Sequence, residues 1–206
     1  MTLATEQGFA LFLAQATVLR GWTLAAQGQG AEGIAQMRQG LDACRATGAE
    51  LFQPYYLALL AEANGQVGQT EEGLRLLVEA LTAAEKTGER VYEAELYRVK
   101  GELLLGQAAA RGAAPTSAAQ PAMFVGGEPS VITEIEVCFR QALSVAHRQQ
   151  ARSLELRAAM SLGRLWQRQG KRDEARQLLA EIFGWFTEGF DTTDLQEARA
   201  LLEAWA

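Results

Sequence analysis

Residues 21–28 read Gly-Trp-Thr-Leu-Ala-Ala-Gln-Gly, a pattern in which a small residue, six other residues and a glycine follow one another. The same spacing returns at residues 61–68 and 163–170. Forty residues separate Gly21 from Ala61, and another 40 separate Ala61 from Gly101. Because a fixed period of 20 to 50 residues is typical of repeat architectures, the chain is predicted to consist of repeats.

The next interval is longer, since Gly163 follows Gly101 by one period and a further twenty-two positions. The pattern resumes at Ile135, which lies one full period before Ala175. The extra residues therefore fall between Gly101 and Ile135, where the segment 111–130 is rich in small residues and proline. We interpret this segment as a flexible insert at the tip of a helical hairpin.

Each repeat is predicted to be a pair of helices, because apolar residues recur at helical spacing between glycine-containing turns. The predicted helices cover residues 4–27 and 31–47, 51–67 and 70–87, 90–109 and 131–149, and 152–169 and 172–188. Their apolar faces can be buried only against neighbouring pairs. The sequence thus predicts an all-α solenoid of four stacked hairpins, as one domain over residues 1–206 with repeats at 4–48, 51–88, 90–150 and 152–189.

A last helix is predicted over residues 193–205, and it would cap the final pair. Thr193 and Gln196 have the spacing of a capping box. One apolar stripe of this helix would cover the preceding hairpin, and it consists of Leu195, Ala198, Leu201 and Leu202.

Composition excludes several classes of protein. The 206 residues carry a formal charge of −6, which argues against nucleic-acid binding, since duplex affinity comes mainly from Lys and Arg. No apolar run approaches the length of a membrane span, and the first residues lack the features of a signal peptide. Two cysteines do not form a disulfide framework, so the expected location is the cytoplasm.

The repeats resemble tetratricopeptide repeats. The resemblance rests on a large apolar residue three positions after the small residue of the first helix, and on the small and large residues four apart in the second, such as Gly73 and Leu77. The period of 40 instead of 34, the missing early Trp and the missing closing proline depart from that family. The departures are explained most simply by longer helices. The resemblance implies that the four hairpins form a right-handed α-α superhelix.

Three longer stretches resemble a narrower group, the C-terminal repeat regions of large bacterial signalling proteins. They are residues 19–41, 48–77 and 161–202, and the resemblance covers nearly all of the chain except the insert. Proteins of that group carry a class III nucleotide cyclase or another regulatory domain followed by a signal-transduction ATPase domain. The resemblance implies a sensor and scaffold region without catalytic parts.

Motifs for catalysis are mostly absent from the sequence. No phosphate-binding Gly-x4-Gly-Lys-Ser/Thr run occurs, and Gly126-Gly127 reads as a plain loop. His147 is the only histidine and lies nine residues after Cys138, roughly 13 Å along a helix, too far for a thiolate–imidazole pair. We therefore expect His147 at the surface, no cofactor, no metal site and no enzymatic activity.

The resemblance to tetratricopeptide repeats implies a groove lined by the first helix of each pair. Positions one residue after the small residue, and three or six before it, are expected to face this groove. The set is aromatic at one end, acidic in the middle and basic at the other, which suits an extended peptide or an amphipathic helix with an acidic segment. The groove residues predicted in this way are Gln15, Trp22, Tyr55, Glu62, Glu95, Arg98, Glu102, Arg157, Met160, Arg164 and, one turn further, Arg168.

Two other patterns leave alternatives open. Aromatic residues recur at Phe12, Phe52 and Tyr92, with Leu154 at the fourth place, and we interpret this row as core between repeats. The segment 148–176 is basic, whereas the segment 181–206 is acidic. The two segments either neutralise each other across the last helices or form an intermolecular contact.

The predicted function is that of a protein-binding scaffold or regulatory domain in a bacterial signalling system. The partner would be a protein or peptide, including the cyclase or ATPase domains of a longer parent. The alternatives are a sensor of a small ligand or peptide that uses the same groove, and a homo-oligomerisation module that associates through its terminal helices. An enzyme with unrecognised catalytic residues is the rival from another class.

Overall fold

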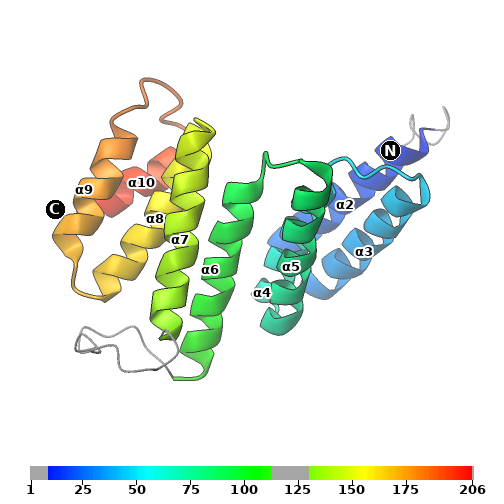
Figure 1. Ribbon diagram of the computed structural model, residues 1–206, viewed down its shortest axis with the longest axis horizontal. Coiled ribbons are helices and arrows are strands. Elements are labelled where there is room, and N and C mark those ends of the chain that lie inside the picture. Colours follow the sequence, from blue (N-terminus) through cyan, green and yellow to red (C-terminus); the bar gives the residue numbers. More distant parts are fainter. Residues whose placement is uncertain (1–8, 113–129, 206) are drawn as a thin grey trace. The chain divides into compact units, whose positions relative to one another are not determined.

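The computed structural model describes residues 9–112 and 130–205, and within them it contains nine α-helices and no strand. The predicted all-α class is confirmed. No helix in these two ranges is long and apolar enough to cross a membrane. The chain divides into two compact units, unit 1 over residues 1–92 and unit 2 over residues 93–206 (Figure 1). The single repeat domain stays a prediction.

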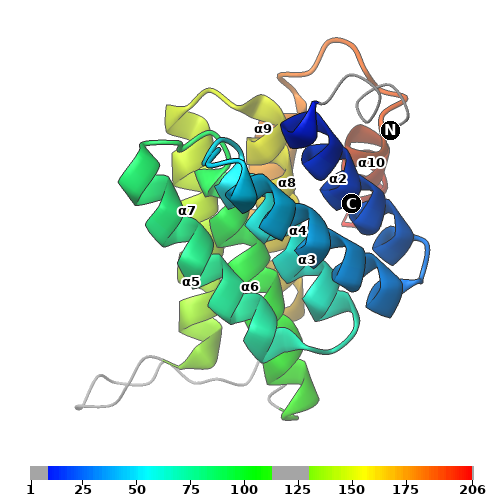
Figure 2. The same cartoon turned by 90° about the vertical axis from the view of Figure 1, so that its right-hand side faces the viewer.

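Unit 1 consists of two helical hairpins. The first pairs α2 (Ala10–Ala26) with α3 (Gly30–Ala46), and the second pairs α4 (Gln53–Gln66) with α5 (Thr70–Thr87). Helix α4 also packs against both helices of the first hairpin. Figure 2 views this unit from the side on which α2 and α3 face the reader.

Unit 2 contains two further pairs and one additional helix. Helix α6 (Glu93–Ala110) pairs with α7 (Val131–Arg148), and α8 (Arg152–Arg168) pairs with α9 (Arg172–Phe183). Helix α8 packs on both α6 and α7, and α10 (Thr193–Ala204) packs on α8 and α9 (Figure 1). The predicted helices and pairs are thus present, and most boundaries agree within three residues.

Two predictions fall wholly or largely outside the described ranges. The predicted flexible insert spans residues 111–130, of which the structure describes only Arg111, Gly112 and Ser130. The first helix was expected from residue 4, but residues 1–8 also lie outside the described ranges. Ser130 caps α7, because its hydroxyl accepts a hydrogen bond from the backbone N–H of Thr133 at 3.3 Å.

The predicted turns inside the hairpins depend on glycine. Gly28, Gly68 and Gly170 have φ values of 88°, 80° and 81°, so each adopts the left-handed conformation after the first helix of its pair. Residues with a Cβ rarely adopt this conformation, whereas glycine adopts it freely. The repeated glycine therefore ends the first helix and turns the chain into the second.

The repeated small residues mark close contacts between helices. A Cβ on Gly21 would lie 2.7 Å from the carbonyl oxygen of Gly33 and from the side chain of Met37 on α3. A Cβ on Gly101 would lie 2.4 Å from the ring of Phe139. The partner differs at Gly163, where the nearest group is the ring of Trp205, just after α10, at 2.7 Å.

Helix α10 covers the last hairpin as predicted, but its N-terminus differs. Leu195 and Ala198 are buried in a cluster with Leu179 of α9, and Leu201 and Leu202 pack against the same cluster. The N-cap residue is Thr192, not Thr193, and its hydroxyl donates backwards to the carbonyl of Gly189 at 2.7 Å. The predicted capping box is therefore absent. Helix α9 also ends early, at Phe183 instead of residue 188, because Phe186 turns into the same cluster.

The predicted core row of aromatic residues is wrong at its first two members. Phe12 is 64% exposed and Phe52 is 38% exposed. Tyr92 is half-buried and stacks on Tyr55 with 4.3 Å between ring centroids. Leu154 packs against the buried residues Val145 and Ala146 of α7, as a core residue does. Phe12 is exposed because it lies on the side of α2 that faces away from the α2–α3 contact.

Candidate partner-binding surface

The predicted groove positions of unit 1 lie on α2 and α4, the first helices of its two hairpins. Trp22 is 37% exposed, and Gln15, Tyr55 and Glu62 are half-buried. All four side chains are therefore at least partly exposed to solvent.

This part of the surface is aromatic and nearly uncharged. Across α2 and α4 the only charged side chains are Arg20 and Glu62. Tyr55 stacks on Tyr92, and its ring also lies 5.5 Å from that of Tyr56. Burial, together with weaker repulsion from neighbouring groups, raises the pKa of Tyr56 to about 12, so its hydroxyl stays neutral. Any partner of this surface must gain affinity mainly from apolar contact.

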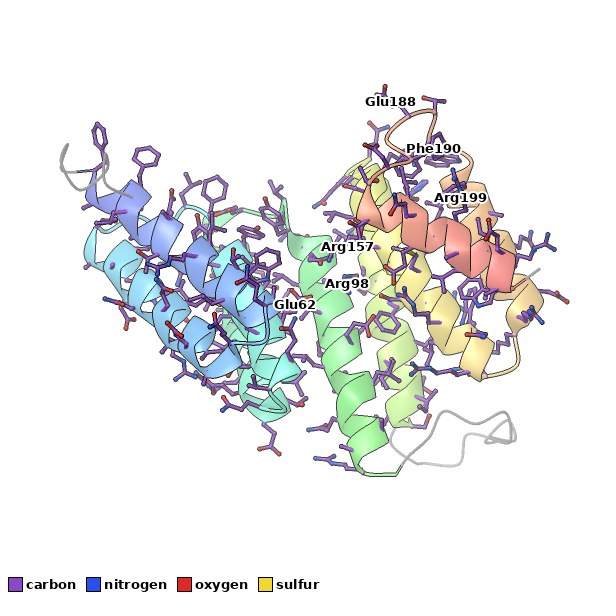
Figure 3. All side chains as sticks on the ribbon, turned by 180° about the vertical axis from the view of Figure 1, so that it is seen from behind. Glu62, Arg98, Arg157, Glu188, Phe190 and Arg199 are labelled. Carbon is purple, nitrogen blue, oxygen red and sulfur yellow. The ribbon has the colours of Figure 1, made fainter. Side chains whose placement is uncertain are left out.

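The groove positions of unit 2 carry charge, and most of it is paired inside the unit. Glu95 on α6 is 8% exposed and accepts hydrogen bonds from Arg98 at 2.7 and 2.9 Å. The guanidinium of Arg157 on α8 lies 2.8 Å from the same carboxylate. Figure 3 shows Arg98 and Arg157 close together beside α6. Two arginines thus share one buried carboxylate, an arrangement that joins α6 to α8.

Most of the remaining charged groove residues of unit 2 also have partners within the unit. Glu102 accepts a hydrogen bond from Ser161 at 2.6 Å. Arg164 forms an ion pair with Glu197 of α10, and the Nε atom of Arg157 lies 4.0 Å from Asp194 at the start of that helix. The acidic last segment therefore neutralises part of the basic one, which confirms the first of the two alternatives drawn from the charge pattern.

Arg168 is the exception among the predicted groove arginines. It is exposed, and within the described ranges no ion pair is found for it. An acidic partner would therefore meet Arg168 without first displacing a carboxylate of this chain.

Met160 is a core residue and not a groove residue. It is 3% exposed and packs with Ala175 and Leu179 of α9. A position three residues before the small residue lies on the same side of the helix as that residue, which faces the second helix of the pair. The related positions Val18 and Ala58 are buried for the same reason. This register position was wrongly assigned to the groove.

A polar cluster that the sequence did not reveal surrounds Glu155. This carboxylate has a side chain only 4% exposed, and it lies 2.8 Å from both Nδ1 of His147 and a guanidinium nitrogen of Arg152. The guanidinium of Arg152 also lies 3.1 Å from the ring centroid of Trp185. His147 is 64% exposed, which confirms its predicted surface position. The spacing of residues in the sequence could not predict this cluster, because Trp185 comes from the segment after α9 and lies far from Arg152 along the chain.

The C-terminal hairpins share a second polar contact. Glu136 on α7 accepts hydrogen bonds from Arg140 at 2.8 and 3.0 Å and from the indole of Trp166 on α8 at 3.2 Å. Burial alone would raise the pKa of Glu136, but these donors and the positive charges of Lys171 and Arg140 together outweigh it and hold the pKa below its usual value. Near the C-terminus, Arg199 lies 5.4 Å above the ring of Phe190 (Figure 3). The bond between Glu136 and Trp166 joins α7 to α8, and the contact between Arg199 and Phe190 joins α10 to the segment before it.

Neither thiol is placed for chemistry. Cys44 and Cys138 are free and buried, and burial raises the pKa of both thiols. Over residues 9–112 and 130–205, no three His, Cys, Asp or Glu side chains are grouped so that they could hold a metal ion.

No protein-family model matches the chain. An uncharacterized protein of Rhizobium meliloti (strain 1021) is 33% identical over 89 residues, which are 43% of this chain. The matched stretch covers only 9% of that protein's length.

Proposed function

We propose that the chain is a tetratricopeptide-like repeat region that binds a protein segment on the first helices of its hairpins. In this proposal the hairpins form a right-handed superhelix, and the region serves as a scaffold or regulatory part of a bacterial signalling protein in the cytoplasm. It acts by binding and not by catalysis. The cyclase or ATPase domains of a longer parent are the first partners to consider.

One observation carries this proposal: at two repeated register positions of the first helices, one residue after the small residue and six before it, all side chains except Glu95 reach the surface, and they do so in chemically distinct groups. In unit 1 these positions supply Trp22 and Tyr55, on helices with almost no charge. In unit 2 they supply Arg157, which pairs with Glu95 of α6 and lies near Asp194, and Arg164, which pairs with Glu197 of α10. Aromatic side chains and arginine are enriched among residues that dominate binding energy.

Arg157 and Arg164 are each paired with carboxylates of this chain, and this reduces the affinity that their charge can contribute to a partner. An acidic segment that binds these arginines must replace carboxylates of this chain, which are Glu95 and Asp194 at Arg157 and Glu197 at Arg164. It therefore gains less than it would from unpaired cations. Arg168 remains available at the surface. We therefore assign the main affinity to Trp22 and Tyr55 and a salt-dependent contribution to Arg168.

The test measures binding of fluorescein-labelled segments of the candidate cyclase and ATPase domains to the whole chain by fluorescence anisotropy. Trp22→Ala is expected to weaken a bound segment about tenfold, and Arg168→Glu about threefold at low salt. Arg176→Glu is the matched control, because Arg176 is also exposed but lies on α9, a second helix. Binding that survives both test variants would contradict the proposed site. Binding of a metabolite instead of a segment would favour the sensor alternative.

A further inference from the structure

The first helix of a hairpin that follows another hairpin buries two stripes of side chains. One stripe packs against the second helix of the same hairpin, and the other packs against the preceding hairpin. On α2 the stripe formed by Ala14, Val18 and Gly21 is buried against α3, since Val18 and Gly21 lie against residues of that helix. The matching positions of α4, one period further along the chain, are also buried.

The second stripe of α4 consists of Tyr56, Leu60 and Ala63, which are 5%, 2% and 1% exposed. Within unit 1 the helices that pack on α4, other than its partner α5, are α2 and α3. The preceding hairpin therefore covers this second stripe.

The same arrangement recurs independently in unit 2. Ala158, Leu162 and Leu165 occupy the matching positions of α8, and each is at most 1% exposed. Helices α6 and α7, which form the preceding hairpin, pack on α8. Burial of the second stripe is thus a regular consequence of one hairpin following another.

On α2 the positions that match this second stripe are Ala16, Arg20 and Thr23. Arg20 and Thr23 are exposed and Ala16 is half-buried, and the exposed residues Phe9, Phe12 and Leu19 lie on the same side of the helix. We name the following set the open face of α2: Phe9, Phe12, Ala16, Leu19, Arg20 and Thr23. Phe12 is 64% exposed, Phe9 53% and Leu19 41%, so large apolar side chains stand in solvent. Figure 2 shows α2 on the viewer's side of unit 1.

The outer side of α10 is built in the opposite way. Its exposed residues include Gln196, Glu197, Arg199 and Glu203, whereas its apolar residues Leu195 and Ala198 are buried. A polar outer side is what a terminal helix of a repeat array needs in water. Helix α2 lacks such a side over its first half.

We propose that the open face of α2 is a docking site for an amphipathic helix of a partner protein, which covers the stripe of α2 whose counterpart on α4 is covered by the first hairpin. The partner helix carries a stripe of large apolar residues that meets Phe9, Phe12 and Leu19. It also carries a carboxylate opposite Arg20, because Arg20 is exposed and forms no ion pair with any described residue. The docking site lies outside the groove positions of the proposed function.

The exposed apolar area favours a single helix over a second copy of this chain. Aromatic side chains present 150 to 250 Å² each, so the exposed parts of Phe9, Phe12 and Leu19 amount to roughly 300 Å². A stable dimer buries about 800 Å² on each partner. In a symmetric pair with parallel α2 helices the two Arg20 side chains would also repel each other.

The test uses two fluorescein-labelled helical peptides of about 18 residues with the same leucine stripe. Glutamates flank the stripe in one peptide, and lysines flank it in the other. We expect the whole chain to bind the glutamate peptide at least about fivefold more tightly, and Arg20→Glu to reverse this preference. Phe12→Ser and Leu19→Ser should each weaken binding about tenfold. Both side chains are exposed, so melting followed by circular dichroism should stay unchanged.

Val78→Ser is the matched control, because Val78 is 62% exposed on α5, away from the open face. It should leave binding unchanged, as should the groove variant Arg168→Glu. Binding of neither peptide, or an equal loss in the control, overturns the proposal. If sedimentation shows a dimer and Phe12→Ser abolishes that dimer, the open face binds a second copy of the chain, and this result also overturns the proposal.

Discussion

The carboxylate of Glu89 accepts the backbone N–H of Phe52 with both oxygens, at 3.1 and 3.0 Å, across 37 residues of sequence. Phe52 has a φ of 63°, a left-handed conformation that is uncommon for a residue with a Cβ. The contact therefore holds the start of α4 against the end of the α4–α5 hairpin.

Glu89→Gln tests this contact. We expect a loss of about 1 kcal/mol in the free energy of unfolding, because a charge-assisted hydrogen bond is replaced by a neutral one. Denaturant unfolding measures the change. Glu85→Gln, at an exposed site on α5, should stay within about 0.5 kcal/mol of the wild type. Equal effects in the two variants would show that the contact adds nothing.

Alanine is expected to have opposite effects at two helical glycines, because Gly21 lies at the close contact of α2 with α3 whereas Gly106 of α6 has free space around it. Gly21→Ala should destabilise the fold by about 2 kcal/mol, since its Cβ would lie 2.7 Å from backbone atoms of α3. Gly106 lies inside helix α6, and a Cβ added there would have no neighbouring atom within 4 Å. Gly106→Ala should therefore stabilise the fold by about 0.5 kcal/mol. Thermal melting of both variants measures the contrast. A neutral Gly21→Ala would mean that the helices separate easily.

The lowered pKa of Glu136 predicts a dependence of stability on pH. Since the folded pKa lies below the ordinary value of 4.5, the folded state binds this proton less tightly than the unfolded state. The carboxylate therefore contributes its full stabilisation above pH 4.5, and the contribution is lost as pH falls through the folded pKa.

Glu136→Gln removes this titration. At about pH 7 we expect the variant to be less stable by about 1 kcal/mol, and at about pH 3 the difference should nearly vanish. Melting temperatures measured across this range give the profile. Glu134→Gln, half-exposed on the same helix, should show a smaller and flatter difference. A Glu136→Gln difference that grows towards low pH would refute the sign.

The cluster around Glu155 predicts energetic coupling. Arg152→Ala should cost about 2 kcal/mol, because it leaves a buried carboxylate with one partner fewer and uncovers Trp185. In a Glu155→Gln background the same change should cost at least about 1 kcal/mol less. Arg148→Ala removes an exposed arginine that bonds only to Ser144 among the described residues, and it serves as the control. Additive effects in the double-mutant cycle would exclude coupling.

The sequence predicted the helix pairs well because their signals are local. Glycine at positions 28, 68 and 170 and the helical spacing of apolar residues determine where each helix ends and which face is buried. The end of α9 was harder to place, since Trp185 and Phe186 leave the helix for contacts with Arg152 and the C-terminal core. Those contacts depend on packing between distant segments.

The candidate surface was only partly predictable. Register placed Trp22 and Tyr55 correctly at the surface, but the same rule placed Met160 there, although it is core. Charge composition indicated a basic last hairpin, yet it did not show which arginines α10 would neutralise. The pairing of Arg164 with Glu197 depends on how α10 packs, which no local pattern encodes.

The lengths of the connections inside the hairpins bear on the order of folding. Three residues join α2 to α3, α4 to α5 and α8 to α9, whereas the whole segment 111–130 joins α6 to α7. Closing the longer connection costs about 1.7 kcal/mol more in chain entropy. The helices of the hairpins with short turns should therefore pair first, and the α6–α7 pair should form late. Its formation then depends on packing contacts such as Phe139 against Gly101, because a short turn does not hold the two helices together.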